Sequence, residues 1–105
     1  MDLEVKAMVS VFMDRYSSQI LLGTSGQPKG IRELSREYDI PVTVCYRRIK
    51  KLVEIGLLKE EKIGKRVKYK SKIEDFNAVM DFEENRLRIS LLADGERYDV
   101  ETPIL

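Results

Sequence analysis

The sequence predicts an α+β fold, with helical segments in the first half of the chain and β-hairpins in the second. Apolar residues recur at helical spacing up to Gly56, and after it the hydrophobic pattern changes to a period of two. Turn-forming glycines and prolines separate these segments. The 105 residues, 43% of them hydrophobic, suit one domain over residues 1–105 with a core of modest size.

The composition excludes several classes of function. A single cysteine and no histidine exclude a disulfide framework, a thiolate zinc cluster and histidine-based catalysis, so we expect no metal or other cofactor. The hydroxyls and carboxylates lack a base partner, and residues 23–30 lack the spacing of a phosphate-binding loop, so we expect no enzyme. No apolar run reaches the roughly 18–20 residues of a membrane span, and no signal peptide is visible. A cytoplasmic protein without membrane contact is therefore expected.

The charges are distributed unevenly along the chain. The formal net charge is +1, but residues 29–72 carry 14 basic and six acidic side chains, a net +8. Residues 73–105 carry three basic and nine acidic side chains, a net −6. A middle segment this basic attracts polyanions. The alternative is an ordinary solvated surface laced with salt bridges.

The first segment, residues 2–13, fits two structures. Its apolar residues lie at helical spacing, but they also alternate as in a strand, and we favour the helix because it gives a coherent apolar stripe. Asp14 then fits the N-cap of a second helix, which ends in the turn formers of residues 23–30.

Two further helices are expected at residues 31–38 and 41–55. Pro41 separates them, because the residue before a proline is pushed out of the helical region and proline itself suits a first helical turn. Gly56 fits the left-handed position that ends the second of these helices.

Hairpins are expected after Gly56. Residues 57–62 and 66–70 alternate on either side of a turn at residues 63–65. A C-terminal β-hairpin is expected within residues 73–92, with its turn at residues 83–85. Residues 93–105 are expected to form a flexible tail, unless Tyr98 and Val100 add a short edge strand.

The order of these segments is that of a winged helix-turn-helix core over residues 14–72. At about 100° per residue, one face of the 41–55 helix is apolar and the other is polar. The apolar face holds Cys45, Ile49, Leu52 and Val53. The polar face holds four candidate base-reading side chains, Thr43, Tyr46, Arg47 and Lys50.

This polar face matches the requirements of a DNA major groove. The groove admits a helix, Arg and Lys donate to guanine O6 and N7, and Thr43 and Tyr46 can contact thymine methyls or phosphate oxygens. The alternative is the wet face of an amphipathic helix. Further cations are candidates for phosphate contact, and Lys51 is preferred over Arg48, whose stem can instead cover apolar surface. These candidates are Lys51, Lys65, Arg66 and Lys68.

Three stretches carry a family resemblance: residues 31–41 (IRELSREYDIP), 46–58 (YRRIKKLVEIGLL) and 64–69 (GKRVKY). Together they resemble the winged helix-turn-helix regulators of the ArsR-like class, common in archaea and bacteria. The resemblance implies a dimer on double-stranded DNA, with the 41–55 helix in the major groove and the 57–70 hairpin, or wing, on the flanking backbone. The chain departs from the metal-sensing members, because Cys45 is its one thiol and it has no histidine.

We therefore expect a sequence-specific transcriptional regulator that binds double-stranded DNA. The alternative is a winged-helix module that binds protein or RNA in a transcription or translation assembly. A homodimer is expected, because a single small winged helix makes few base contacts. The candidate dimer contacts are Leu3, Met8, Val11 and Phe12. No small-molecule effector is identified.

Overall fold

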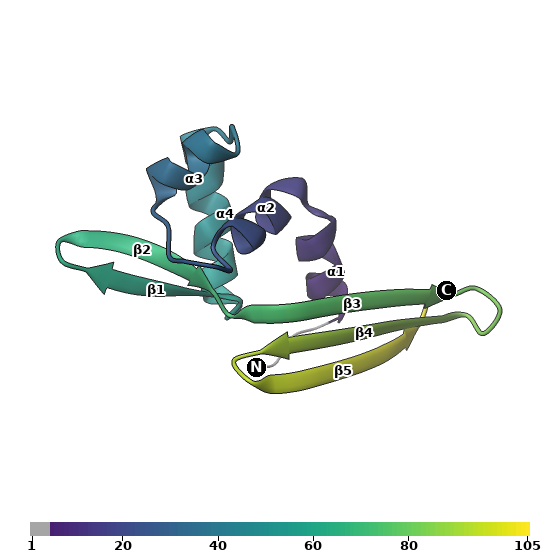
Figure 1. The fold of residues 1–105 in the computed structure, drawn as a ribbon. Helices are drawn as coiled ribbons and strands as arrows, with labels where there is room; N and C mark the ends of the chain where they lie inside the picture. Colours follow the sequence, from purple (N-terminus) through teal and green to yellow (C-terminus); the bar gives the residue numbers. More distant parts are fainter. Residues whose placement is uncertain (1–4) are drawn as a thin grey trace. The chain divides into compact units, whose positions relative to one another are not determined.

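The computed structural model describes residues 5–105, except for the side chains at positions 5, 6 and 8 (Figure 1). The fold is α+β, as predicted. The chain divides into two compact units, Met1–Lys72 and Ile73–Leu105, where the sequence suggested one domain. The division arises because each strand after Lys72 pairs with the next strand along the chain, so the second unit is held together by local pairings.

In the described part of the first unit, residues 5–72, there are four helices and a two-stranded antiparallel hairpin. These elements are α1 (Val5–Met13), α2 (Arg15–Gly23), α3 (Ile31–Glu37), α4 (Val42–Glu54), β1 (Leu58–Ile63) and β2 (Arg66–Ser71). Residues 5–13 are thus helical, which decides between the two structures that the sequence allowed. Residues 2–4, including Leu3, lie outside the described part of the chain.

Asp14 joins two helices of this unit, α2 and α4. It is the N-cap of α2, as predicted: its Oδ2 accepts hydrogen bonds from the Ser17 backbone N–H at 3.0 Å and from Ser17 Oγ at 2.6 Å. The same oxygen accepts a hydrogen bond from Arg48 Nε at 2.8 Å, so an ion pair ties α4 to the start of α2. Burial acts to raise the pKa of the Asp14 carboxyl, but the bonds from Ser17 and Arg48 outweigh it and hold the pKa below its ordinary value.

The turn between α3 and α4 is fixed by its own hydrogen bonds. Asp39 takes a left-handed conformation, with φ of +52°, which directs Ile40 into the core. The Ser35 side chain donates to the Ile40 carbonyl, and the Ile40 N–H donates to the Ser35 carbonyl at 2.9 Å. Pro41 then occupies the N-cap of α4, because its backbone cannot donate to a preceding turn.

The core of the first unit lies between the helices and the base of the hairpin. Gly56 ends α4 with φ of +86°, as predicted, and the buried Leu57 and Leu58 follow it. The other fully buried apolar side chains of this core come from α2, α3, α4 and the turn between α3 and α4. They are Ile20, Leu34, Ile40, Cys45, Ile49 and Leu52.

The hairpin β1–β2 is attached to the loop that leads into α3. Lys29 and Tyr69 exchange two backbone hydrogen bonds, of 3.0 Å and 2.8 Å, as an isolated antiparallel bridge. The Ser71 N–H also donates to the Thr24 carbonyl at 3.1 Å. Beyond the bridge the hairpin projects from the helices to a turn at Gly64, where φ is +65° (Figure 1).

The second unit is an antiparallel sheet of three strands in the order β3 (Ile73–Asp81), β4 (Arg86–Ala93) and β5 (Glu96–Pro103). The expected hairpin is present as β3–β4. The flexible tail is replaced by β5, and the edge strand that Tyr98 and Val100 suggested is eight residues long. The reason is the turn at Asp94 and Gly95, where both residues have positive φ and so match the twist of the flanking strands.

We expect Asp14 to control the acid stability of the protein. Replacement of Asp14 by alanine should lower the free energy of unfolding by about 1–2 kcal/mol, the usual effect of losing an N-cap. Asp14→Asn should retain much of the cap while losing the ion pair with Arg48. Because folding lowers the pKa of Asp14, the carboxylate stabilises the fold above its ordinary value of 3.8, and this contribution is lost as the pH falls through the lowered value.

Urea denaturation of the wild type and both variants between pH 7 and pH 2 measures these effects. The decline in stability below about pH 4 should be shallower in both variants. A wild-type and an Asp14→Asn curve of identical shape would contradict the role of the carboxylate charge.

Cys45 should behave as a core side chain rather than a reactive thiol. It is fully buried on α4, its Sγ donates to the Ile31 carbonyl at 3.7 Å, and burial raises the pKa of its thiol. Cys45→Ala should therefore cost about 1–2 kcal/mol of unfolding free energy. An alkylating reagent at pH 7.5 should label Cys45 only in step with unfolding, and rapid labelling in native buffer would contradict this packing.

Candidate nucleic-acid interface

The outer face of α4 is exposed and polar. Thr43, Tyr46, Arg47 and Lys50 are all exposed, and Tyr46 keeps 51% of its surface accessible although it is an aromatic residue. The opposite face is buried. The division of α4 into two faces therefore agrees with the sequence prediction, while contact with DNA bases stays a prediction.

Three of these side chains border one hollow. A concave surface of about 450 Å³ lies between the beginning of α3 and the beginning of α4, and Thr43, Tyr46 and Arg47 line it. Its remaining lining residues are Ile31, Arg32 and Val42, so the hollow contains two cations and no acidic side chain. Lys50 lies one turn farther along α4, with its Nζ 5.8 Å from the centre of the Tyr46 ring.

The cations on α4 divide into two kinds. Arg48 is held by Asp14 and so serves the packing of α4 against α2. Arg47, Lys50 and Lys51 are exposed, and within the described residues none of them forms an ion pair. The preference for Lys51 over Arg48 as a phosphate contact is thus consistent with their surroundings.

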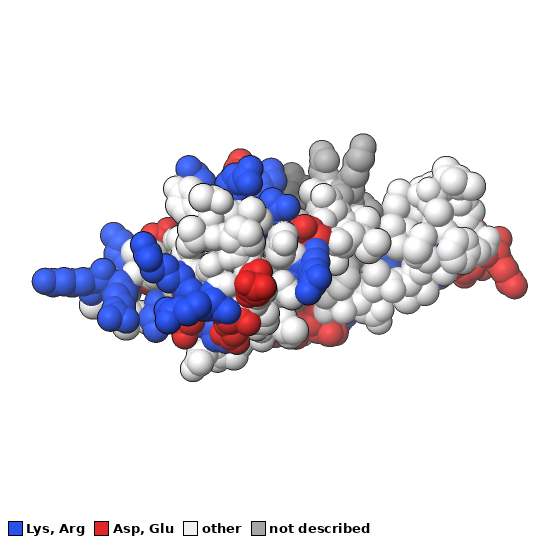
Figure 2. Space-filling view, turned by 90° about the horizontal axis from the view of Figure 1, so that it is seen from above, with Lys and Arg blue, Asp and Glu red and all other residues white. Residues whose placement is uncertain are grey.

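The hairpin carries the next group of cations. Lys65 and Arg66 are exposed beside Gly64, and Lys68 is half-buried farther down β2. Figure 2 shows that Lys and Arg side chains gather over this hairpin. Lys59 differs from them, because its Nζ lies 3.5 Å from Glu61 on the same strand. Three of the four cations predicted to contact phosphate, Lys65, Arg66 and Lys68, therefore lie on one hairpin.

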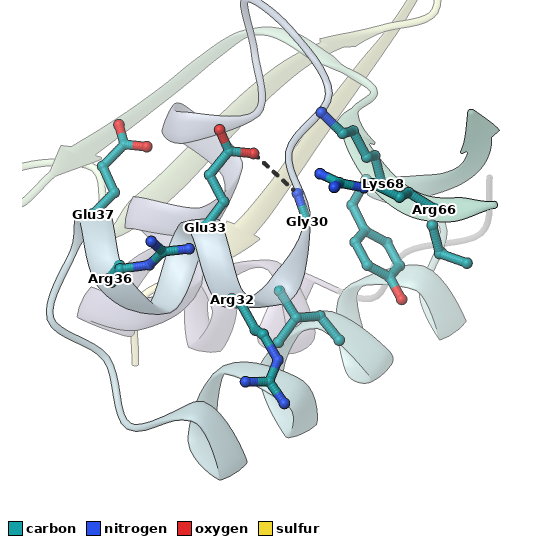
Figure 3. A pocket seen from close by; sticks show the side chains of 10 residues that line it. Gly30, Arg32, Glu33, Arg36, Glu37, Arg66 and Lys68 are labelled. Carbon is teal, nitrogen blue, oxygen red and sulfur yellow. Dashed lines mark hydrogen bonds between the residues drawn. The ribbon is translucent and has the colours of Figure 1, made fainter. Parts of the chain in front are cut away.

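A larger open groove, of about 980 Å³, lies between α3 and β2. Figure 3 shows Arg32 and Arg36 on the α3 side, and Arg66 and Lys68 on the β2 side. The half-buried Tyr69 also lines this groove; burial, followed by the nearby Glu60 and Tyr46, raises the pKa of its phenol.

Sequence reasoning missed Arg32 and Arg36. Both are exposed on α3, a helix that the sequence presents only as a short amphipathic segment. Their relation to the hairpin depends on the bridge between Lys29 and Tyr69, which brings together positions 40 residues apart. The one available signal was the basic character of residues 29–72 as a whole, which includes both arginines.

The four candidate dimer contacts are only partly described. Leu3 and the side chain of Met8 lie outside the described residues. Val11 is buried and Phe12 is half-buried. The most exposed apolar side chains of α1 and α2 in the described part of the chain are instead Met13, at 81%, and Leu22, at 73%.

Residues 5–105 bring together no group of three His, Cys, Asp or Glu side chains that could hold a metal ion. In the same part of the chain, every helix is too short or too polar to cross a lipid bilayer.

Comparison of the chain with protein-family models, with curated proteins and with solved structures gave no match.

Proposed function

We propose that residues 14–72 form a winged helix-turn-helix domain of the ArsR-like class, and that the protein is a cytoplasmic, sequence-specific transcriptional regulator that binds double-stranded DNA. The observation that carries this proposal is the hollow at the beginning of α4. Thr43, Tyr46 and Arg47 border it beside Arg32, and no acidic side chain lines it. An exposed helix face with cations and no acidic side chain suits the negatively charged major groove.

In this proposal α4 lies in the major groove and reads bases. Arg47 donates to O6 and N7 of a guanine, the commonest specific contact between a protein and DNA. Thr43 and Tyr46 contact a thymine methyl or a phosphate oxygen. Lys50 extends the same surface by one helical turn, since its ammonium already lies over the Tyr46 ring.

The hairpin β1–β2 acts as the wing and holds the flanking backbone. Lys65 and Arg66 are at its tip, where a glycine turn projects them from the helices. Lys68 on β2 and Lys51 on α4 add further phosphate contacts. Such cations release counterions from DNA, which supplies affinity that does not depend on sequence.

A second candidate function is the docking of a protein partner. It is favoured by exposed apolar side chains close to the same cations, namely Val42 at the beginning of α4 and Ile63 and Val67 on the hairpin. The two functions differ in salt dependence, because binding of an apolar surface lacks the steep salt slope of phosphate contact.

We expect Arg47 and Lys65 to play different roles on DNA. Arg47→Ala should cost about 1–3 kcal/mol of binding free energy and relax the preference at one base pair. Lys65→Ala should weaken binding to all duplexes alike and lower the salt slope of the binding constant by about one unit. Site selection from random duplexes measures the first effect, and salt titration with one fixed duplex measures the second.

Glu54→Gln is the matched control, because it changes an exposed charge on α4 without removing a cation. It should shift affinity through the general electrostatic field and leave the selected sequence unchanged. If the Arg47→Ala variant selects the same DNA sequence as the wild type, the proposal that α4 reads bases is wrong.

We further propose that the protein binds DNA as a homodimer, with half-sites about one helical turn apart. Light scattering at micromolar concentration should give twice the mass of the chain for the free protein, and that mass plus the mass of the DNA on a two-half-site duplex. Leu22→Glu tests whether this exposed apolar side chain lies in the dimer interface. The neighbouring Leu21 is not substituted, because it is buried in the core. A monomer in both states would refute the dimer.

A further inference from the structure

The groove between α3 and β2 combines cations from two elements. Arg32 and Arg36 project from α3, and Arg66 and Lys68 project from β2 (Figure 3). Both walls belong to the unit Met1–Lys72, and the hydrogen bonds between Lys29 and Tyr69 hold β2 beside the beginning of α3. The cations therefore stand around one open space of about 980 Å³.

Two carboxylates also line this groove, but each already has a partner. Glu33 Oε1 accepts the Gly30 backbone N–H at 3.3 Å and so caps α3 (Figure 3). Both carboxylate oxygens of Glu37 accept hydrogen bonds from Lys29 Nζ at 2.8 Å, and this contact raises the pKa of the Lys29 ammonium.

The four cations, by contrast, are left without such partners. Within the described residues, none of Arg32, Arg36, Arg66 and Lys68 forms an ion pair, whereas Lys29, Arg48 and Lys59 each do. Four cations against the two carboxylates leave the lining of the groove with a net charge of +2. An anion that enters the groove meets guanidinium groups from both walls, and guanidinium binds phosphate in a bidentate manner.

Arg32 connects this groove with the surface on α4. The same side chain lines the hollow that contains Thr43 and Arg47 and also the groove between α3 and β2. The two concave surfaces are therefore neighbours. A DNA backbone that passes beside the base-contacting face of α4 can continue into the groove along Arg32.

We infer that the groove between α3 and β2 holds a segment of the DNA sugar–phosphate backbone, with Arg32 and Arg36 as phosphate contacts opposite Arg66 and Lys68. The inference rests on the proposed DNA-binding function and adds a site to it. DNA is thus held in the groove beside β2 as well as at the tip of the hairpin.

The experiment compares two charge-matched double variants. Arg32→Ala with Arg36→Ala removes two positive charges from the groove, and Arg86→Ala with Arg97→Ala removes two exposed positive charges from Ile73–Leu105. Each protein binds one random-sequence duplex in a salt titration. Thermal unfolding verifies that both variants are folded.

The groove variant should lower the salt slope by about two units and weaken binding about 10- to 100-fold at 0.1 M salt, because each lost phosphate contact removes a slope of about 0.9. The selected DNA sequence should stay the same, since phosphate contacts carry no base information. Arg32→Lys with Arg36→Lys should restore the slope. Ethylation of individual phosphates should interfere with wild-type binding at positions where it no longer affects the groove variant.

A groove variant whose salt slope and ethylation pattern equal those of the wild type would overturn the inference, as would a loss no larger than that of the Arg86 and Arg97 variant. If Arg47→Ala still alters sequence preference in that case, the proposed DNA-binding function stands and only the groove site is lost. A wild-type protein that binds no duplex would overturn both together.

Discussion

Two backbone hydrogen bonds between Lys29 and Tyr69 determine how the cationic surfaces of this protein are arranged. They attach the β1–β2 hairpin to the residues immediately before α3, so that one wall of the groove is a strand and the other a helix. Backbone bonds of this kind do not depend on side-chain identity, and they hold the hairpin base while its tip at Gly64 projects freely. Without the bridge, the basic residues of the hairpin and those of α3 would be two separate patches.

Three acidic residues of the first unit, Asp14, Glu33 and Glu37, help to build the fold. Asp14 caps α2 and holds Arg48, Glu33 caps α3, and Glu37 holds Lys29. Each carboxylate therefore has an internal role of a kind that stabilises helix ends or positions an element. By contrast, the cations that line the groove, Arg32, Arg36, Arg66 and Lys68, form no ion pair within the described residues.

Local signals in the sequence predicted most of the elements. Asp14, Pro41 and Gly56 each impose a conformation through their own backbone or a near neighbour, and the structure has all three as expected. The exposed and buried faces of α4 were predictable for the same reason, since helical spacing determines them. Arg36 was not predictable as a site residue, because its importance arises from a strand distant in the sequence.

The strand β5 was predicted only as a short alternative to a flexible tail, although its turn signal was local. Asp94 and Gly95 form a two-residue turn in which both residues have positive φ, a strong indication of a hairpin. The polar character of residues 93–105 obscured it, because a strand at the edge of a sheet needs few apolar residues. When a polar segment follows a predicted strand, a two-residue turn such as Asp94-Gly95 is therefore better evidence for a further strand than low hydrophobicity is against it.

The order of the three-stranded sheet also bears on how copies of this chain meet. In a sheet ordered β3-β4-β5, the two outer strands form the edges of the sheet, and both are acidic. The acidic residues on them are Glu74, Asp75 and Asp81 on β3, and Glu96, Asp99 and Glu101 on β5. Like charges along both edges repel a neighbouring sheet, which protects the protein from edge-to-edge aggregation. Any stable self-association consequently has to use side-chain surfaces rather than continuation of this sheet from one copy to the next.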